Sequence, residues 1–435
     1  MAQSIGIPIP RVLFFAMTAQ FAVAGAFMPF VRPFLTDSGL TAQETSWVFA
    51  AAALGTSTLP LLWGFLADRF IAPARLLAAM NLLVAVIFVV LGRAQGAVSF
   101  ALLLPLLTGV LFSTFAVLNA LSYHVLESPR EHFGRLRLWG SLGWGLPAGF
   151  VWVWLTVRES SSFGFLPFFG ATLALLAAAA SWWLPGVPAR GGSPGSQPVS
   201  DPGVGLALGV PAPERATGGT SVPAGPEGSY ARAVGGVLRN RAFLALLAVG
   251  FVSFPSFTIW FYYSPSYLEQ LGFARRWLGP VQCVGVFAEI PLLLLLGPAI
   301  RRLGFRGTLL LGASALLARQ LLYATCADPW VLVASYLLAA TGVVFSTLAL
   351  SLALDALTHR TIRASAQTLA TFVGPGLGQI LGHLVVGWLN RGPTEDLRRG
   401  FWFASLCSAL AVVILLVFLR ERDFVPGPSG PRSDG

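Results

Sequence analysis

The sequence predicts an all-α integral membrane protein with twelve transmembrane helices in two pseudo-symmetric bundles of six. Of its 435 residues, 55% are hydrophobic and 11% are charged, whereas an ordinary soluble domain carries about 25% charged residues. The chain contains twelve apolar stretches near the length of about 20 residues that a helix needs to span a bilayer. A segment rich in glycine, proline and serine separates the first six stretches from the last six.

Short polar connections join most of the predicted spans. The first span is too long for the apolar region of a signal peptide, and no convincing small-residue cleavage site follows it. We therefore expect it to be retained. In chain order, the predicted spans are 11–34, 44–66, 75–93, 98–122, 136–156, 163–184, 241–266, 277–300, 307–326, 330–355, 364–389 and 400–420.

The long central segment, residues 186–238, breaks the apolar pattern. Its composition cannot bury enough apolar area to offset the entropy lost on ordering, so we expect a flexible cytoplasmic linker. The linker divides the chain into an N-terminal six-helix bundle at 1–185 and a C-terminal six-helix bundle at 239–424. The polar composition of residues 425–435 predicts a disordered tail.

The two halves repeat one another in their connections. GFLADR (64–69) lies between the second and third spans, and GPAIRRLG (297–304) lies at the equivalent place between the eighth and ninth. Arginines also open the fifth and eleventh spans, at Arg137 and Arg363, and spaced glycines follow each. Internal duplication explains these similarities. One large class of transporters consists of two six-helix halves that are related as parallel repeats and bind substrate between them, near the membrane midplane. The repeated connections predict this architecture.

Arginine supplies every basic charge, since the chain contains no lysine, and the net charge is +10. The arginines are spread between the spans instead of gathering on one soluble face, so we expect no nucleic-acid partner. Connections on the side of both termini carry more arginines than the others. This predicts a bacterial-type inner membrane with both termini in the cytoplasm, although Arg275–Arg276 and Arg398–Arg399 run against the rule.

The cysteines do not indicate an enzyme, and the sequence contains none of the common catalytic motifs. Cys283, Cys326 and Cys407 lie in or beside predicted spans without a CxxC spacing, so no disulfide framework or zinc site is indicated. The sequence contains no HExxH, Gly-x-Ser-x-Gly or P-loop motif. We therefore expect no enzymatic activity, no metal site and no cofactor.

Several stretches resemble a known family. GFLADR (64–69) resembles the turn between the second and third spans of the major facilitator superfamily, where Gly-x-x-x-Asp-Arg is the commonest signature. Within the superfamily, the chain is similar to the nucleoside:proton symporters. The similar stretches are NALSY (119–123), RLWGSLGW (137–144), AE (288–289), AR (318–319) and IRASAQ (362–367).

This resemblance covers nearly the whole chain. It implies a symporter in the lipid bilayer that uses a proton to import a nucleoside, or a similar small hydroxylated ring compound, by alternating access. We expect a monomer. The resemblance also implies that Asp68 and Arg69 form a gating clasp between helices; an unstructured turn is the alternative.

Two ionisable residues within the spans are the candidates for proton coupling. A charge inside a span costs about 2.5–3.5 kcal/mol on insertion scales, so it is expected to face a cavity or a partner. Glu289 lies near the middle of the eighth span, and Arg319 lies in the ninth. Antiparallel helices with a short turn are neighbours, so we expect the two to pair. Glu289 would take up a proton on one side and release it on the other; a static ion pair that fixes helix packing is the alternative.

The fifth span carries the candidates for substrate binding. Arg137, Ser141 and Trp144 follow the i, i+4 and i+7 spacing of one helix face. A cation, a hydroxyl and an aromatic plane on one stripe suit a flat ring with hydroxyls, and the matching residues of the resembled family contact the nucleoside. The alternative is an arginine that sets topology beside a packing serine and an interfacial tryptophan.

Other polar residues are weaker candidates. Asn119 and Tyr123 lie one helical turn apart and could contact the substrate or form an ordinary hydrogen bond between helices. His383 lies beside Gln379 in the eleventh span and could relay protons, although a neutral packing histidine is the favoured interpretation. Asp355 is interpreted as the solvated end of the tenth span.

The seventh span departs from the resembled family. That family places amide side chains there, whereas this chain reads FTIWFYY (257–263) and offers Thr258 and Phe261 as substrate contacts. Val286 stands where the family has a glutamine, and GVVF (342–345) stands where it has an acidic residue. A more aromatic cavity suits stacking on a ring but weakens recognition of a ribose or a base edge.

Other functions on the same scaffold remain open from the sequence. They are a sugar or oligosaccharide:proton symporter, a drug exporter that uses the aromatic lining, and an aromatic-acid permease with Arg137 or Arg319 as the counter-ion of a carboxylate. A membrane enzyme lacks a catalytic motif, and a receptor lacks a soluble signalling domain.

Overall fold

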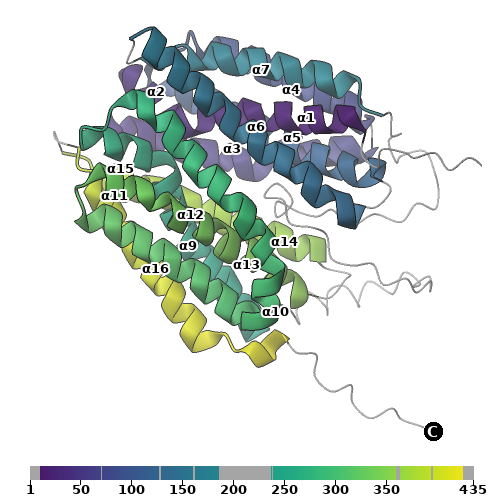
Figure 1. Cartoon of the computed structure of the whole chain (residues 1–435), viewed down its shortest axis with the longest axis vertical. Helices are drawn as coiled ribbons and strands as arrows, with labels where there is room; N and C mark the ends of the chain where they lie inside the picture. The colour runs from purple at the N-terminus through teal and green to yellow at the C-terminus, as the bar shows by residue number, and fades with distance from the viewer. Residues whose placement is uncertain are drawn as a thin grey trace, which may run out of the picture.

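The computed structural model consists of helices and their connections in the part of the chain that it describes. The described residues are 10–69, 71–126, 129–159, 162–185, 237, 239–358, 363–392 and 395–424. The predicted linker at 186–238 and the predicted tail at 425–435 therefore lie almost wholly outside the described residues. Figure 1 shows the helices of the two halves as two bundles, one above the other.

The N-terminal bundle contains the helices that precede residue 186. They are α1 (Arg11–Phe27), η1 (Met28–Phe30), α2 (Val31–Asp37), α3 (Ala42–Arg69), α4 (Pro73–Leu91), α5 (Gly96–Val125), α6 (Pro129–Val157) and α7 (Leu166–Trp182). The C-terminal bundle begins at Arg241. Its helices are α9 (Arg241–Gln270), η4 (Arg275–Trp277), α10 (Leu278–Thr325), α11 (Pro329–Ala334), α12 (Tyr336–Gly342), η5 (Val343–Leu348), α13 (Ala349–Ala356), α14 (Arg363–Thr371), η7 (Phe372–Gly378), α15 (Gln379–Leu389), α16 (Arg398–Phe418) and η8 (Glu421–Phe424).

The helices confirm a multi-pass helical membrane protein. Within the described residues, eight helical segments are long and apolar enough to cross a membrane. All twelve predicted spans fall on helix, although the count of twelve membrane crossings stays a prediction. Two differences are local: the predicted tenth and eleventh spans each contain a π-helical turn, at Val343–Leu348 and Phe372–Gly378.

The longest helix, α10, contains two predicted spans that meet at Gly304. Gly304 has φ 72° and ψ 179°, a conformation that residues with a Cβ rarely adopt. The carboxylate of Glu421 accepts hydrogen bonds from the backbone N–H groups of Phe305 and Arg306, both at 3.0 Å. A carboxylate at this point caps the helix that starts after Gly304, since it satisfies free N–H groups at the positive end of the helix dipole.

Glycines let α1 and α6 approach closely in the N-terminal bundle. A Cβ on Gly143 of α6 would collide with the backbone of Thr18, and a Cβ on Gly25 of α1 would collide with the backbone of Trp144. The predicted role of the glycine-spaced run in close helix packing is therefore what the structure shows for Gly143. This packing fixes the height and rotation of the α6 face that carries the candidate site.

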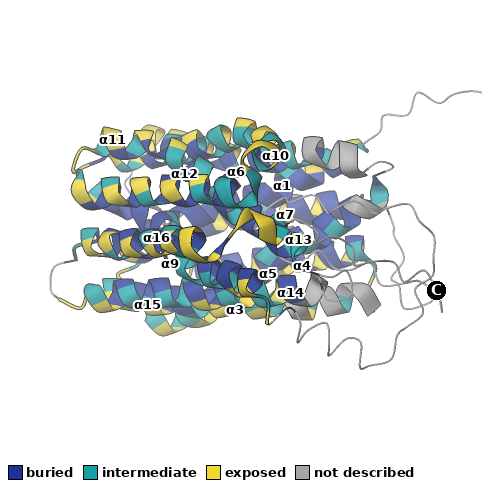
Figure 2. Cartoon of the chain, turned by 90° about the horizontal axis from the view of Figure 1, so that it is seen from below, coloured by how far each residue is buried: buried dark blue, intermediate teal, exposed yellow. Residues whose placement is uncertain are grey.

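The outer surface is apolar, as expected for helices in contact with lipid. Large side chains such as Trp182, Trp183 and Phe418 are 71%, 78% and 60% exposed. Figure 2 shows exposed residues along the flanks of α15 and α16, with buried residues toward the interior. An apolar surface of this extent is unfavourable in water and favourable in a bilayer.

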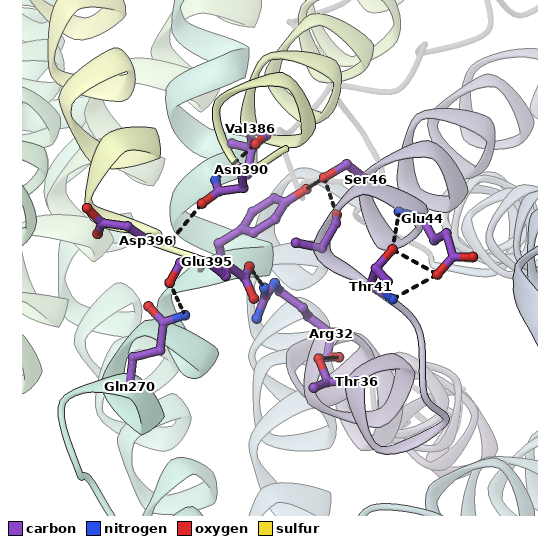
Figure 3. A network of polar contacts seen from close by, with 12 residues as sticks. Arg32, Thr36, Thr41, Glu44, Ser46, Gln270, Val386, Asn390, Glu395 and Asp396 are labelled. Atoms are coloured by element: carbon purple, nitrogen blue, oxygen red, sulfur yellow. Dashed lines mark hydrogen bonds and ion pairs between the residues drawn. The ribbon is translucent and has the colours of Figure 1, made fainter. Parts of the chain in front are cut away.

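Two ion pairs join the bundles at one end of the molecule. Arg32 of α2 pairs with Glu395, in the connection before α16, and Asp37 at the end of α2 pairs with Arg275 of η4 at 2.6 Å. Figure 3 shows the side chains of Arg32 and Glu395 pointing toward one another. We call this the clasped end. The opposite end, which holds residues 182–185 and 239–241, is the linker end.

Candidate functional site

Arg137 projects from α6 onto an aromatic face. Its guanidinium carbon lies 4.2 Å from the centroid of the Phe21 ring, and Phe21 stacks on Phe115 with centroids 4.3 Å apart. Cation–π contact of this kind stabilises a desolvated cation by about 2 kcal/mol. The buried Nε and Nη1 atoms have no hydrogen-bond partner, so two directed donors remain for an acceptor that comes from elsewhere.

Glu289 of α10 is the acidic residue that interacts electrostatically with Arg137. Their helices belong to different bundles and pack together, as shown by the 3.4 Å contact between Cys283 Sγ and the backbone oxygen of Gly145. The single acid of α10, which lies near the middle of the predicted eighth span, and the arginine that opens the predicted fifth span therefore face one site at the interface of the bundles. The sequence identified both residues as candidates but did not predict their interaction.

Arg319 does not pair with Glu289 as the sequence predicted. It is fully buried, its Nη2 donates to the hydroxyl of Tyr323 at 3.2 Å, and its guanidinium lies over three rings. The rings are those of Tyr323 at 4.4 Å, Tyr336 at 4.9 Å and Trp260 at 5.0 Å. Aromatic side chains from α9 and α12 thus occupy the surroundings of this cation and stabilise it in place of a carboxylate.

Ser141 and Trp144, the other two predicted residues of the α6 face, lie near aromatic side chains of the C-terminal bundle. Ser141 is buried at 7% exposure, and the Trp144 ring lies 6.3 Å from the Phe261 ring of α9 at an angle of 55°. Phe261 in turn stacks on Phe257, at 5.8 Å and 9°. The structure therefore brings Trp144, on the helix that carries Arg137, together with Phe261 of the other bundle.

Other predicted residues lie elsewhere or outside the described part. Thr258 is fully buried, its hydroxyl has no hydrogen-bond partner, and its Cβ packs near Gly382 of α15. Asn119 is fully buried in α5. Tyr123, Asp68 and Arg69 lie on described helices, but their side chains are outside the described residues, so their predicted roles stay predictions.

Sequence reasoning missed Phe21 and the aromatic cage of Arg319. Phe21 lies in an apolar run of α1 in which all residues from Ala19 to Phe27 are buried, so no pattern marks it. The cage combines Trp260 of α9 with Tyr336 of α12, two helices that are far apart in the sequence. Only the three-dimensional structure can show that they meet around Arg319. Within the described residues, no group of three His, Cys, Asp or Glu side chains is placed to hold a metal ion.

Comparison with known proteins identifies the family. The model of the MFS_1 like family matches residues 11–395. The chain belongs to this family. Its two helical bundles are thus those of a major facilitator superfamily protein.

Individual relatives are distant but match over nearly the whole chain. The chain is 23% identical over 431 residues to the putative nucleoside transporter YegT of Escherichia coli, covering 94% of each protein. It is 27% identical over 408 residues to the maltose permease of Geobacillus stearothermophilus, covering 92% of this chain and 93% of the permease.

Solved structures share the fold. The nucleoside transporter NupG matches with a TM-score of 0.74 at 16% identity, covering 94% of this chain and 97% of NupG. An auto-inhibited POT family peptide transporter matches with a TM-score of 0.67 at 13% identity, covering 97% of this chain and 99% of the transporter. These relatives are membrane transporters, and the chain is a multi-pass membrane transporter of the same superfamily.

Proposed function

We propose that the protein is a proton-coupled symporter that imports a nucleoside, or a similar small hydroxylated ring compound, by alternating access. The observation that carries this proposal is the approach of Trp144 to Phe261 at the bundle interface, on the α6 helix whose Arg137 interacts electrostatically with Glu289 of the other bundle. Each bundle supplies one charged group and one aromatic group. A ligand at this place therefore contacts both moving halves, as alternating access requires.

Proton coupling follows from the interaction of Glu289 with Arg137. While Glu289 is ionised, its attraction to Arg137 links α10 to α6 across the interface. Protonation removes that attraction and leaves the two unpartnered donors of Arg137 free for the substrate. Binding of a proton to Glu289 and binding of substrate to Arg137 therefore favour one another, which is the coupling that a symporter needs.

The aromatic layer supports a ring-shaped substrate. The 6.3 Å separation of the Trp144 and Phe261 rings, one from each bundle, offers two π faces for contact with a flat ring. Donors of Arg137 and the hydroxyl of Ser141 lie on the same α6 face. The resemblance to proteins named as nucleoside transporters favours a nucleoside over other ring compounds.

The arginine distribution supports a location in a bacterial-type inner membrane, with the linker end and both termini in the cytoplasm. In this orientation the clasped end faces outward, and the ion pairs of Arg32 and Asp37 hold the outer side of the transporter closed. The proposed working unit is a monomer, because both halves of the site lie in one chain.

A second candidate is a sugar transporter. The maltose permease of Geobacillus stearothermophilus, at 27% identity over 92% of this chain, is the observation that favours it. Hydroxyl groups of a sugar would also accept hydrogen bonds from Arg137, and aromatic faces contact the apolar faces of pyranose rings.

Uptake into proteoliposomes distinguishes these substrates. Labelled uridine, adenosine and maltose are each offered under an inward proton gradient, with and without a protonophore. We expect protonophore-sensitive uptake of a nucleoside and no competition by maltose. Uptake of maltose alone would establish the second candidate, and no uptake of any of the three by folded protein would contradict the substrate class proposed.

A further inference from the structure

His383 lies in a buried junction between the two bundles. It is fully buried on α15, where its ring centroid lies 5.0 Å from Phe49 of α3 and 5.0 Å from Tyr262 of α9. Its Nδ1 atom lies 3.1 Å from the hydroxyl of Tyr263. The imidazole thus has one wall from the N-terminal bundle, formed by α3, and one from the C-terminal bundle.

We assign the proton of His383 to one ring nitrogen from the hydrogen bonds around Tyr263. Ser46 donates its single hydroxyl hydrogen to the backbone oxygen of Ala42 at 2.9 Å. The 3.3 Å contact between the hydroxyls of Ser46 and Tyr263 therefore needs Tyr263 as the donor. Tyr263 has then used its hydrogen, so it accepts from Nδ1–H of His383. The other nitrogen, Nε2, carries the lone pair, and it has no hydrogen-bond partner.

The charged side chains that interact with Tyr263, those of Arg32 and Glu395, are paired with one another. The guanidinium of Arg32 lies 5.3 Å from the centroid of the Tyr263 ring, and it forms the clasped-end ion pair with Glu395. Tyr262 accepts a hydrogen bond from Gln379, a neutral amide on α15 itself. Among the groups that face His383 from α3, α9 and α15, the described polar side chains are hydroxyls and amides. An imidazolium here would be a buried charge without a counter-ion, which is strongly unfavourable.

We propose that His383 is a second proton-binding site, which accepts a proton on Nε2 only when the bundles separate at the clasped end. This proposal rests on the alternating access of the proposed function but not on the role of Glu289. Separation removes Phe49 of α3 from the imidazole and Ser46 of α3 from Tyr263. Water then reaches Nε2 and delivers a proton, forming one N–H bond and leaving Nδ1–H intact. The bundles can close again only after that proton leaves.

The proposal predicts a pH dependence of defined size. An imidazole in water has a pKa of about 6.5. If only the open form takes the proton, acid stabilises the open form, and the ratio of open to closed molecules rises about tenfold between pH 7.5 and pH 5.5.

Spin labels report this ratio. Gln95 and Ala327 are exposed at the clasped end of opposite bundles, so cysteines at these two positions, in a protein whose three native cysteines are replaced, give the distance across that end. Electron–electron double resonance at both pH values measures the long-distance population. We expect an increase of about tenfold in the open-to-closed ratio of the parent protein at pH 5.5.

Variants separate His383 from other proton acceptors. His383→Phe should abolish the increase, whereas Tyr263→Phe, which keeps Nε2, should retain it. Glu289→Gln should also retain the increase. If this variant loses proton-driven uptake but keeps the pH response of the open-to-closed ratio, the role of Glu289 in coupling and the role of His383 are separate. A full pH response in His383→Phe, or no response in the parent protein, would overturn the assignment of His383.

Chemical modification gives a second test that needs no substitution at His383. Diethyl pyrocarbonate reacts with an unprotonated imidazole nitrogen that solvent can reach. Peptide mapping of the parent protein should show His383 protected in the clasped form and modified when substrate and a proton gradient drive cycling. Equal modification in both conditions would contradict a site that is sealed by closure of the bundles.

Discussion

At the scale of single residues, the central feature is a half-buried arginine whose buried guanidinium nitrogens are incompletely hydrogen-bonded. Arg137 contacts the face of Phe21 and interacts with Glu289, yet Nε and Nη1 have no partner. A buried donor without an acceptor costs about 1–3 kcal/mol. Sites of this kind are retained where a ligand supplies the missing acceptor.

Substitution of Arg137 tests this interpretation. Arg137→Met should reduce substrate uptake by at least about tenfold, because the directed donors are lost while the side-chain volume is nearly kept. Arg93→Met removes an exposed arginine whose guanidinium donates a hydrogen bond to the backbone oxygen of Val89, so it is the matched control. Uptake in Arg137→Met equal to that of the control variant would exclude a role of Arg137 in binding.

At the scale of helices, the sequence predicted positions well and partners poorly. Apolar length alone located the helices, and GPAIRRLG (297–304) correctly marked the break that Gly304 makes in α10. The predicted pairing of Glu289 with Arg319 was wrong because chain order says only that two helices are neighbours. Which helix faces meet depends on the packing of α6 against α10 and on the aromatic rings around Arg319. The periodicity of a single helix carries no information about these contacts between helices.

Close packing of α1 on α6 yields a prediction for stability. Gly143→Ala should lower the thermal unfolding midpoint in detergent, because the added methyl group collides with the Thr18 backbone and overpacking costs about 1–3 kcal/mol. Gly149→Ala, on the same helix, places its methyl group in open space. It should leave the midpoint unchanged or raise it slightly. Equal unfolding midpoints for both variants would show that α1 shifts to accommodate the added methyl group without loss of stability.

At the scale of the whole molecule, the two bundles are joined by ion pairs at the clasped end. Arg32 is 3% exposed and its partner Glu395 is 27% exposed, so loss of the carboxylate leaves a buried cation. Removing one partner of a buried pair costs about 3–5 kcal/mol, whereas exposed pairs contribute about 0–1 kcal/mol. The Arg32–Glu395 pair should therefore contribute more to closure than exposed pairs do.

Glu395→Gln should thus shift the molecule toward opening at the clasped end. The distance between spin labels at positions 95 and 327 is the measurement, and we expect the long-distance population to grow at least about tenfold. Asp396→Asn alters the neighbouring acid, which is 49% exposed and pairs with Arg399 inside one bundle. This control should leave the distances unchanged. An identical distribution in both variants would show that the pair does not hold the bundles together.

The central claim is that protonation of Glu289 couples the proton to transport through its electrostatic interaction with Arg137. Glu289→Gln imitates the protonated side chain permanently. The most direct test compares, in one preparation of this variant, uptake driven by a proton gradient with exchange of labelled for unlabelled substrate at equal pH on both sides. We predict that gradient-driven accumulation falls to the level of empty liposomes while exchange persists. Accumulation at the parent rate would contradict the account.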